Sequence, residues 1–271
     1  MDFIDPHAPN ATIIRRRDLN HRVAIVHVRP DSGSIQEFVP GQFVQLGLPV
    51  ETDAARSPGD PRKRTKLVKR SYSIASSPQE HDAYELCIAF VDQGQLTPKL
   101  KPLTVGARIW HDAQPKGFFT MEKVPDGRDL VFVATGTGIA PFVSMLRLYR
   151  TVPNRFQSFV VVHGARESSD LAYHEELAAL ARVDERVRYV PVLSREPEAS
   201  GWSGLRGRVQ IALEEARLAA HARVALDPAN THVFLCGNPD MIQAVRDLLT
   251  PRGFVADTVK VPGNLHFERY W

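Results

Sequence analysis

Short runs of β-forming residues, separated by turn residues, fill the first part of the chain from about residue 10 to residue 119. The clearest runs cover residues 22–28, 42–48, 71–75, 84–90 and 107–111. Apart from a short turn near residues 98–100, no helical pattern interrupts them. So many short strands in succession predict a closed or nearly closed antiparallel β-barrel.

The pattern changes after residues 123–127, where compact apolar runs begin to alternate with helical periodicity. Strands are predicted at 130–134, 158–163, 188–193 and 232–235, and helices at 141–150, 172–181, 210–220 and 241–249. Uniformly apolar strands are typical of a parallel sheet that helices cover on both faces. We therefore predict two domains, a barrel over residues 1–124 and a Rossmann-like α/β domain over 125–271, with a site where they meet.

The composition narrows the classes of protein that fit this pattern. The chain has 271 residues, of which 43% are hydrophobic and 24% charged, as expected of a soluble globular protein. It lacks a membrane-length apolar run, and its acidic start does not resemble a signal peptide. Two cysteines, Cys87 and Cys236, are too few for a four-cysteine zinc or iron–sulfur site. We expect a cytoplasmic protein without a metal centre of its own.

Positive charge is concentrated in one segment. The chain has a net charge of +3, yet residues 56–70 carry seven basic side chains and one acid. The segment fits either a solvated surface loop or a docking site for an acidic partner. It has no aromatic residues interleaved with its basic ones, which argues against binding of single-stranded nucleic acid.

Two segments of the barrel have the chemistry of a cofactor site. Arg70-Ser71-Tyr72-Ser73 offers a cation for a diphosphate, an aromatic ring for stacking and hydroxyls for a ring nitrogen. Thr97 and Pro98 form an N-cap and first-turn pair, so that the backbone N–H groups of this helix start, which Gly94 precedes, would suit a diphosphate. Taken alone, the two segments also fit an ordinary exposed strand and a plain capped helix.

The second domain carries a glycine loop and several arginines at predicted strand ends. Residues 134–141, Ala-Thr-Gly-Thr-Gly-Ile-Ala-Pro, follow a strand and open a helix, where Gly136 and Gly138 would admit a pyrophosphate. The third glycine of the common dinucleotide fingerprint is replaced by Pro141. Arg166, Arg195 and Arg208 follow later strands and suit a ribose 2′-phosphate, although surface arginines are also common.

The last predicted strand ends in Cys236, followed by Gly237, Asn238 and Asp240 at a helix start. By base rate Cys236 is a buried inert thiol. The chain then finishes with Phe267-Glu268-Arg269-Tyr270-Trp271. An aromatic cluster at a terminus suggests a lid that stacks on a ligand.

These motifs, in this order, resemble the ferredoxin/flavodoxin–NADP(+) reductase family of the bacterial type from about residue 10 to residue 271. The resemblance implies an antiparallel FAD-binding barrel followed by an NADP(H)-binding α/β domain. It carries over the following FAD-binding residues: Arg70, Ser71, Tyr72, Ser73, Cys87, Ile88, Ala89, Phe90, Gln95, Leu96, Thr97, Tyr270 and Trp271, the last over the adenine. The residues implied for NADP(H) are Thr137, where the two cofactors meet, and Ala165, Arg166, Ser194, Arg195, Arg208, Gly237, Asn238 and Asp240.

By the same resemblance, hydride passes between nicotinamide and flavin, and the flavin releases single electrons. Tyr72, Ser73, Cys236 and Glu268 would position the rings or relay a proton. His266, Phe267 or Glu268 would face the isoalloxazine. The acceptor would be a separate acidic ferredoxin or flavodoxin, and we expect a monomer that binds neither nucleic acid nor membrane. Two alternatives are the NAD(P)H-dependent reductase component of an oxygenase system and a non-enzymatic regulatory protein that uses the basic segment.

Overall fold

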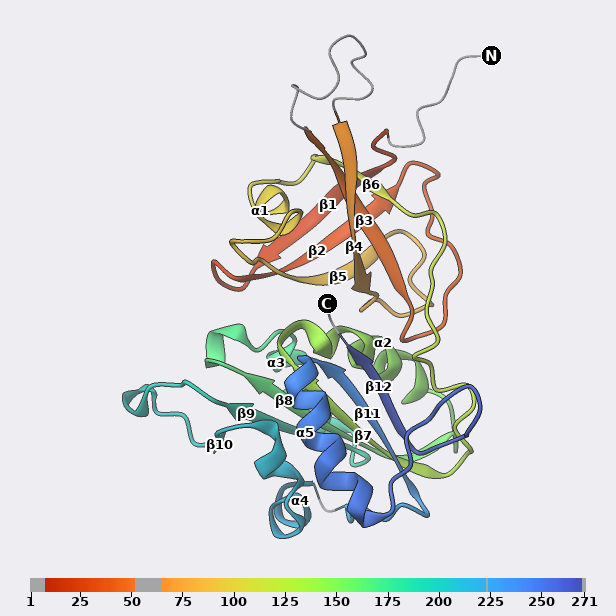
Figure 1. Cartoon of the computed structure of the whole chain (residues 1–271), viewed down its shortest axis with the longest axis vertical. Helices are drawn as coiled ribbons and strands as arrows, with labels where there is room; N and C mark the ends of the chain where they lie inside the picture. The colour runs from red at the N-terminus through yellow and green to blue at the C-terminus, as the bar shows by residue number, and fades with distance from the viewer. Residues whose placement is uncertain (1–7, 52–64, 223, 270–271) are drawn as a thin grey trace.

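The structure, a computed structural model, describes residues 8–51, 65–222 and 224–269. Two domains stack along the long axis of the molecule, and the last described strand ends at their junction (Figure 1). Within the described residues, no helix combines the length and apolar character needed to cross a membrane.

The first domain is an antiparallel sheet of six strands in the order β4-β3-β6-β1-β2-β5. Its strands are β1 (Ala11–Asp18), β2 (Val23–Pro30), β3 (Phe43–Glu51), β4 (Thr65–Ser73), β5 (Tyr84–Ala89) and β6 (Arg108–His111). A bridge between Ile74 and Leu86 links the two edges of the sheet, so the predicted barrel is confirmed. The strand predicted at 71–75 begins earlier, because β4 pairs with β3 from Thr65 onward.

The second domain is a parallel sheet of six strands in the order β10-β9-β8-β7-β11-β12, which confirms the predicted α/β fold. The strands are β7 (Arg128–Thr135), β8 (Phe156–Ala165), β9 (Val187–Leu193), β10 (Leu205–Arg206), β11 (Thr231–Gly237) and β12 (Leu265–Arg269). The helices are α2 (Ala140–Tyr149), α3 (His174–Val183), α4 (Glu215–Ala222) and α5 (Pro239–Leu249), with the 3-10 turn η3 (Gly136–Ile139) before α2.

One prediction for this domain is wrong. The single helix expected at 210–220 is a 3-10 turn, η6 (Val209–Leu213), followed by α4, because Glu214 between them is extended. No pattern in the sequence predicted β12, which pairs in parallel with β11 before the aromatic end of the chain. Edge pairing supplies the backbone hydrogen bonds that keep this segment in the fold.

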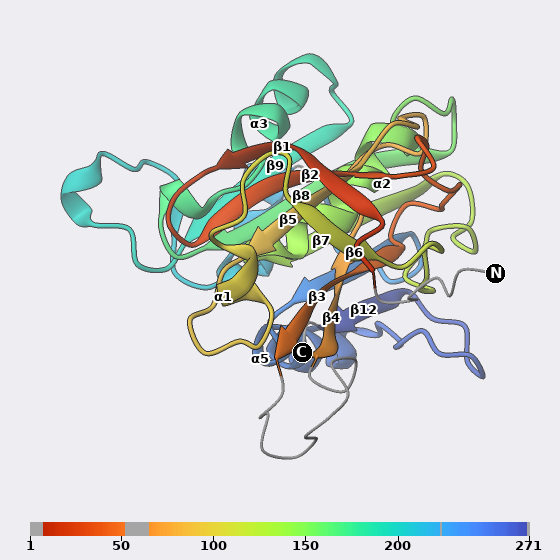
Figure 2. The same ribbon diagram turned by 90° about the horizontal axis from the view of Figure 1, so that it is seen from above.

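Helices cover both faces of the parallel sheet, and one of the resulting hydrophobic clusters continues into the barrel. Residues of α4 and α5 pack on one face, and residues of α2 and α3 on the other. The cluster beneath α2 and α3 also contains Val23, Ile25, Ala75 and Cys87 of the barrel domain. Seen from above, the barrel strands lie over the parallel sheet (Figure 2). The two domains therefore share buried apolar surface, which fixes their relative position.

Polar contacts add to this junction. The guanidinium of Arg147 on α2 lies 3.2 Å from the buried carboxylate of Glu85 and donates to the Ala75 carbonyl. On the same helix Ser144 donates to the carbonyl of Ser76 at 2.7 Å. These contacts hold α2 against the barrel and so position the glycine loop that precedes it.

Candidate active site

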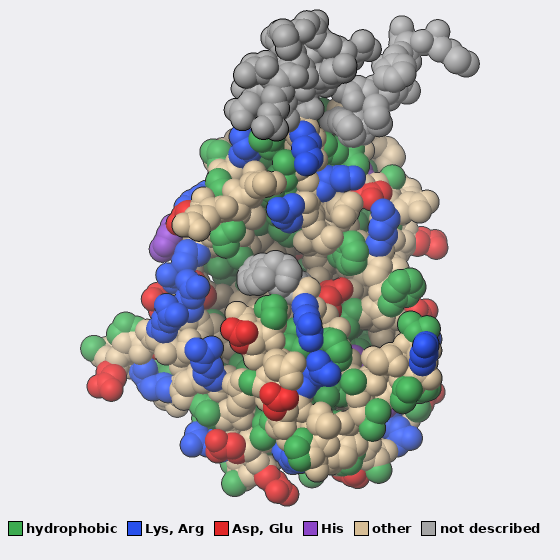
Figure 3. Space-filling view, in the orientation of Figure 1, with side chains coloured by type: hydrophobic (Ala, Val, Ile, Leu, Met, Phe, Trp, Pro, Cys, Tyr) green, Lys and Arg blue, Asp and Glu red, His purple; other side chains and the backbone are tan. Residues whose placement is uncertain are grey.

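Two cavities open at the domain junction and share three wall residues, Ala89, Val91 and Thr137. The barrel cavity has a volume of about 430 Å³, and the sheet-edge cavity, at the carboxyl ends of the parallel strands, about 490 Å³. Lys and Arg side chains lie on both sides of the hollow between the domains (Figure 3). Ligands in the two cavities would therefore meet near Thr137.

The barrel cavity is built around the end of β4. All four residues of Arg70-Ser71-Tyr72-Ser73 line it, since the strand ends here and both of its faces border the space. The hydroxyl of Tyr72 is buried and forms no hydrogen bond with any described residue. Burial also raises the pKa of this phenol, which keeps it a neutral donor. A polar group of a bound ligand would satisfy it.

Ser73, Cys236 and Glu268 meet at the inner wall of this cavity. The Ser73 hydroxyl donates to Oε2 of Glu268 at 3.3 Å, and Sγ of Cys236 lies 4.0 Å from the same oxygen. The parallel pairing of β12 with β11 sets Glu268 opposite Cys236. Burial raises the pKa of Glu268 to about 7, and the Ser73 hydrogen bond partly opposes this rise. The carboxyl is thus able to take up and release a proton near neutral pH.

Of the three tail residues proposed to face a flavin, only Glu268 lines the barrel cavity within the described part of the chain. The ring of His266 stacks on Phe234, with centroids 4.1 Å apart. Phe267 lies under the guanidinium of Arg246. Tyr270 and Trp271 lie outside the described residues, so their predicted stacking on adenine stays a prediction.

The segment around Cys87 is divided between the two cavities. Cys87 and Ala89 line the barrel cavity, and Ala89 and Phe90 line the sheet-edge cavity. Ile88 lines neither, because its side chain belongs to the barrel core. Burial raises the pKa of Cys87 to about 12, so its thiol is neutral. Cys236 is fully buried and lines neither cavity, and its Sγ lies 4.0 Å from Oε2 of Glu268 in the wall of the barrel cavity.

The residues Gln95, Leu96 and Thr97 line the barrel cavity, but the predicted capping by Thr97 is wrong. The helix α1 (Thr97–Leu100) includes Thr97, and its N-cap is Leu96, without a side-chain hydrogen bond. The Thr97 hydroxyl instead donates to the Val91 carbonyl at 3.1 Å and accepts from its N–H at 3.3 Å. The turn over residues 91–97 brings Thr97 back to Val91, and these two hydrogen bonds close the turn.

The sheet-edge cavity lies where β7, β8, β9 and β11 end, which is where open parallel α/β sheets bind their ligands. Its wall includes the following predicted residues: Thr137, Ala165, Arg166, Ser194, Arg195, Arg208 and Asn238. Gly136 lines it in a left-handed conformation with φ +55°. The predicted role of Gly138 differs, because a Cβ there would lie 2.2 Å from the Cys236 carbonyl oxygen. Gly138 therefore permits packing onto β11 and does not line the cavity.

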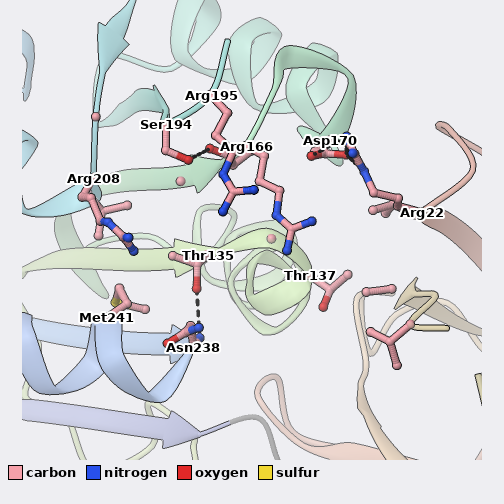
Figure 4. A pocket seen from close by; sticks show the side chains of 18 of the residues that line it. Arg22, Thr135, Thr137, Arg166, Asp170, Ser194, Arg195, Arg208, Asn238 and Met241 are labelled. Carbon is pink, nitrogen blue, oxygen red and sulfur yellow. Dashed lines mark hydrogen bonds and ion pairs between the residues drawn. The ribbon is translucent and has the colours of Figure 1, made fainter. Parts of the chain in front are cut away.

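Three exposed arginines border this cavity without an ion pair to any described residue: Arg166, Arg195 and Arg208 (Figure 4). The fourth arginine, Arg22, comes from the barrel and is held by Asp170 at 3.0 Å and Glu167 at 3.2 Å. Three unneutralised guanidinium groups around one cavity make it a site for an anionic ligand.

Two of the predicted nucleotide-binding residues, Gly237 and Asp240, have structural roles between β11 and α5 and do not contribute to the cavity surface. A Cβ on Gly237 would lie 2.2 Å from the Thr135 hydroxyl, so this position requires glycine. The N–H of Asp240 donates to the Asn238 side chain at 2.7 Å, so Asn238 caps α5 at the helix start that the sequence predicted. Gly237 and Asp240 line neither cavity.

Sequence reasoning missed several wall residues, above all Arg22 and Gln210 of the sheet-edge cavity and Phe43 and Arg269 of the barrel cavity. No local motif marks Arg22, since its place at the cavity depends on contact between two domains. Among the described residues there is no cluster of His, Cys, Asp and Glu suited to holding a metal ion.

A barrel joined to a parallel sheet, with one cavity in each and a shared wall, is the arrangement of a two-domain enzyme whose two ligands meet at the domain junction. The family model of the oxidoreductase NAD-binding domain matches residues 132–247. A crystal structure of a ferredoxin NADP+ reductase from Neisseria gonorrhoeae with bound FAD and NADP is 28% identical, with a TM-score of 0.80. The alignment covers 96% of this chain and 97% of that one.

Curated relatives give the particular family. A flavodoxin/ferredoxin–NADP reductase of Buchnera aphidicola subsp. Baizongia pistaciae is 32% identical over 239 residues, 88% of this chain and 89% of that protein. Ferredoxin–NADP reductase B of Sorangium cellulosum is 36% identical over 258 residues, 91% of this chain and 96% of that protein. The chain belongs to the flavodoxin/ferredoxin–NADP reductase family, as its motifs predicted.

Proposed function

We propose that this chain is a ferredoxin (flavodoxin)–NADP(+) reductase, which transfers electrons between NADPH and a one-electron carrier protein through bound FAD. The observation that carries the proposal is the shared wall of the two cavities at Ala89, Val91 and Thr137. A flavin in the barrel cavity and a nicotinamide in the sheet-edge cavity would have contact there, as direct hydride transfer requires.

The lining of the barrel cavity fits FAD. Tyr72 supplies an aromatic face and an unsatisfied buried hydroxyl, and Arg70 supplies charge for a diphosphate. Gln95, Leu96 and Thr97 border the same space. When bound, FAD supplies the conversion between a two-electron hydride and single electrons. We assign Tyr270 and Trp271 to its adenine end on the sequence alone.

In this proposal Ser73 and Glu268 are the catalytic side chains of the barrel cavity. The Ser73 hydroxyl donates to Oε2 of Glu268, so the pair holds a proton beside the ring that Tyr72 would stack on. Because the pKa of Glu268 is about 7, its carboxyl exchanges that proton at working pH at little cost. Cys236, 4.0 Å from the same oxygen, keeps the carboxylate in place.

For NADP(H), we assign Arg195 and Arg208 to the 2′-phosphate, together with Ser194 and the neighbouring Arg166. Their guanidinium groups lack acidic partners among the described residues, so a phosphate dianion would not have to displace any. Thr137 belongs to the wall that the two cavities share, and Asn238 lines the sheet-edge cavity. NADPH would therefore be preferred to NADH.

We further propose that an acidic ferredoxin or flavodoxin docks over the barrel cavity. Arg70 and Arg269 line this cavity, and the guanidinium groups of Arg246 and Arg269 both lie over the ring of Phe267. The basic segment 56–70, mostly outside the described residues, precedes Ser71 in the chain and adds charge of the same sign. We also propose that the protein is a monomer, which light scattering would test. We propose that it is cytoplasmic, which cell fractionation would test.

One experiment tests the core of the proposal. The purified protein should be yellow, release FAD on heating, and reduce a ferredoxin with NADPH faster than with NADH. A sample that releases FMN or no flavin would refute the cofactor assignment. A sample that prefers NADH would instead support the reductase component of an oxygenase system.

A further inference from the structure

Three polar aromatic side chains form a hydrogen-bonded chain behind the glycine loop. Nε2 of His163 lies 3.1 Å from the Gly136 carbonyl oxygen, and its Nδ1 lies 3.4 Å from the Tyr189 hydroxyl. The same hydroxyl lies 3.3 Å from Nδ1 of His174. His163 is fully buried between β7 and β9, so this contact is shielded from water.

The Gly136 carbonyl oxygen at one end of the series sets the direction of the other hydrogen bonds. A carbonyl oxygen only accepts, so Nε2 of His163 must carry the hydrogen. Burial lowers the pKa of His163 to about 4, so the ring is neutral and its Nδ1 accepts a hydrogen bond. The Tyr189 hydroxyl therefore donates to His163, and its oxygen accepts from His174. Each member of the chain fixes the tautomer or rotamer of the next.

The series of hydrogen bonds ends at the carbonyl of Gly136, and Gly136 is the residue at which the glycine loop turns. Gly136 has φ +55°, and it borders the sheet-edge cavity with no non-neighbouring atom within 4 Å of its Cβ position. On the other side of the loop, the Thr135 hydroxyl accepts from the Asn238 N–H at 2.9 Å. A glycine samples many backbone conformations, so an outside hydrogen bond is needed to select one.

We propose that His163 is a positioning residue for dinucleotide binding: its Nε2–H fixes the Gly136 carbonyl, and Tyr189 keeps His163 in the tautomer that can do so. The inference rests on the proposed function in one respect, that a dinucleotide occupies the sheet-edge cavity. It concerns the part of the ligand that NADPH and NADH share, because Gly136 lies on the β7 loop and not among the arginines at the ends of β8 and β9.

His163→Leu and Tyr189→Phe test the proposal in the FAD-loaded enzyme. Loss of one buried hydrogen bond should raise KM about 5- to 10-fold for NADPH and for NADH alike. The kcat should stay within about twofold, as expected when ground-state binding is lost. His163→Gln should recover most of the affinity, because its amide nitrogen can donate from nearly the same place as Nε2. Tyr149→Phe, which removes a hydroxyl from half-buried Tyr149 on α2, serves as the matched control.

The outcomes separate this inference from the proposed function. If the NADPH/NADH ratio stays constant while both KM values rise, and the glutamine variant recovers, the positioning role is supported. If His163→Gln binds as poorly as His163→Leu at equal thermal stability and FAD content, the ring acts by packing and the inference is overturned. If Tyr189→Phe leaves both KM values unchanged, the tautomer argument is overturned, whatever the arginine variants do to the ratio.

Discussion

The hydroxyl of Ser73 and the carboxylate of Glu268 lie 3.3 Å apart, although 195 positions separate them in the chain. Ser73 ends a barrel strand, and Glu268 lies on the last strand of the parallel sheet. A proton-holding pair is thus assembled from both domains. The geometry of this pair therefore depends on the apolar junction that holds the two domains together.

The first prediction concerns Glu268→Gln. Because the pKa of Glu268 is raised to about 7, its carboxyl is mostly protonated at pH 6 and mostly ionised at pH 8. The kcat with NADPH and a small neutral acceptor should change across pH 7 in the native enzyme. Glu268→Gln should lose this inflection and about 100-fold in kcat. The exposed Glu37→Gln variant is the control, and an inflection that persists in Glu268→Gln contradicts the role.

The variant Ser73→Ala tests whether the Ser73 hydroxyl raises or lowers the pKa of Glu268. The hydrogen bond from Ser73 lowers the pKa of Glu268, against the larger effect of burial. Its removal should therefore move the inflection in kcat to higher pH, since the ionised carboxylate loses a donor. Steady-state kinetics between pH 5.5 and pH 9 measure the shift. An inflection that moves to lower pH would show that the hydroxyl does not stabilise the carboxylate.

Arg195→Ala and Arg208→Ala test the nucleotide assignment. A charge-assisted hydrogen bond to phosphate is worth roughly 1.5–3 kcal/mol, so kcat/KM for NADPH should fall about 10- to 150-fold. NADH lacks the phosphate and should be used as before. The exposed Arg182→Ala on α3 is the matched control. If neither cavity variant changes the NADPH/NADH ratio, these arginines do not read the phosphate.

Glu85→Gln should weaken the domain junction in a pH-dependent way. Burial alone would raise the pKa of Glu85, but His27 and Arg147 lower it to about 2, below its ordinary value of 4.5. The ionised carboxylate therefore stabilises the fold above pH 4.5, and this stabilisation disappears as the pH falls toward 2. Urea unfolding should show a loss of about 3 kcal/mol at pH 7. The difference should shrink in acid, and exposed Glu80→Gln should cost less than about 1 kcal/mol.

Reversal of Arg62, Lys63 and Arg64 to Glu tests the basic segment, which lies outside the described residues apart from its end. Exposed charges act mainly on the rate of encounter and are screened by salt. Reduction of an acidic ferredoxin should slow at low ionic strength, whereas reduction of a small neutral acceptor should not. Equal losses with both acceptors would indicate a folding defect.

Deletion of Trp271 tests the predicted lid. Base–aromatic stacking is worth roughly 1–3 kcal/mol, so FAD should bind about 5- to 150-fold more weakly. Fluorescence titration of the apoprotein with FAD measures the change. Unchanged affinity would mean that the residue packs elsewhere.

The sequence by itself determined the features that depend on neighbouring residues. Short β-forming runs separated by turn residues predicted the barrel, and uniformly apolar runs that alternate with helical periodicity predicted the parallel sheet. The motifs at 70–73, 134–141 and 236–240, together with the arginines after later strands and the aromatic terminus, indicated the family. These three motifs supplied only part of the wall of each cavity. The helix starts at Pro141 and at Asn238-Pro239 were also predicted, since the signals for a helix start are local.

Only the tertiary structure decided which distant groups meet. Glu268 could not be chosen over His266 or Phe267 until the register of β12 on β11 set it opposite Cys236. The capping assignment of Thr97 failed because its hydroxyl bonds back to Val91, a contact set by the fold of the turn and not by the helix-start pattern. Arg22 and the His163 chain carry no local signal at all, because their partners come from other strands and another domain. These positions are set by burial and by strand pairing between residues far apart in the sequence, so no short segment of the sequence predicts them.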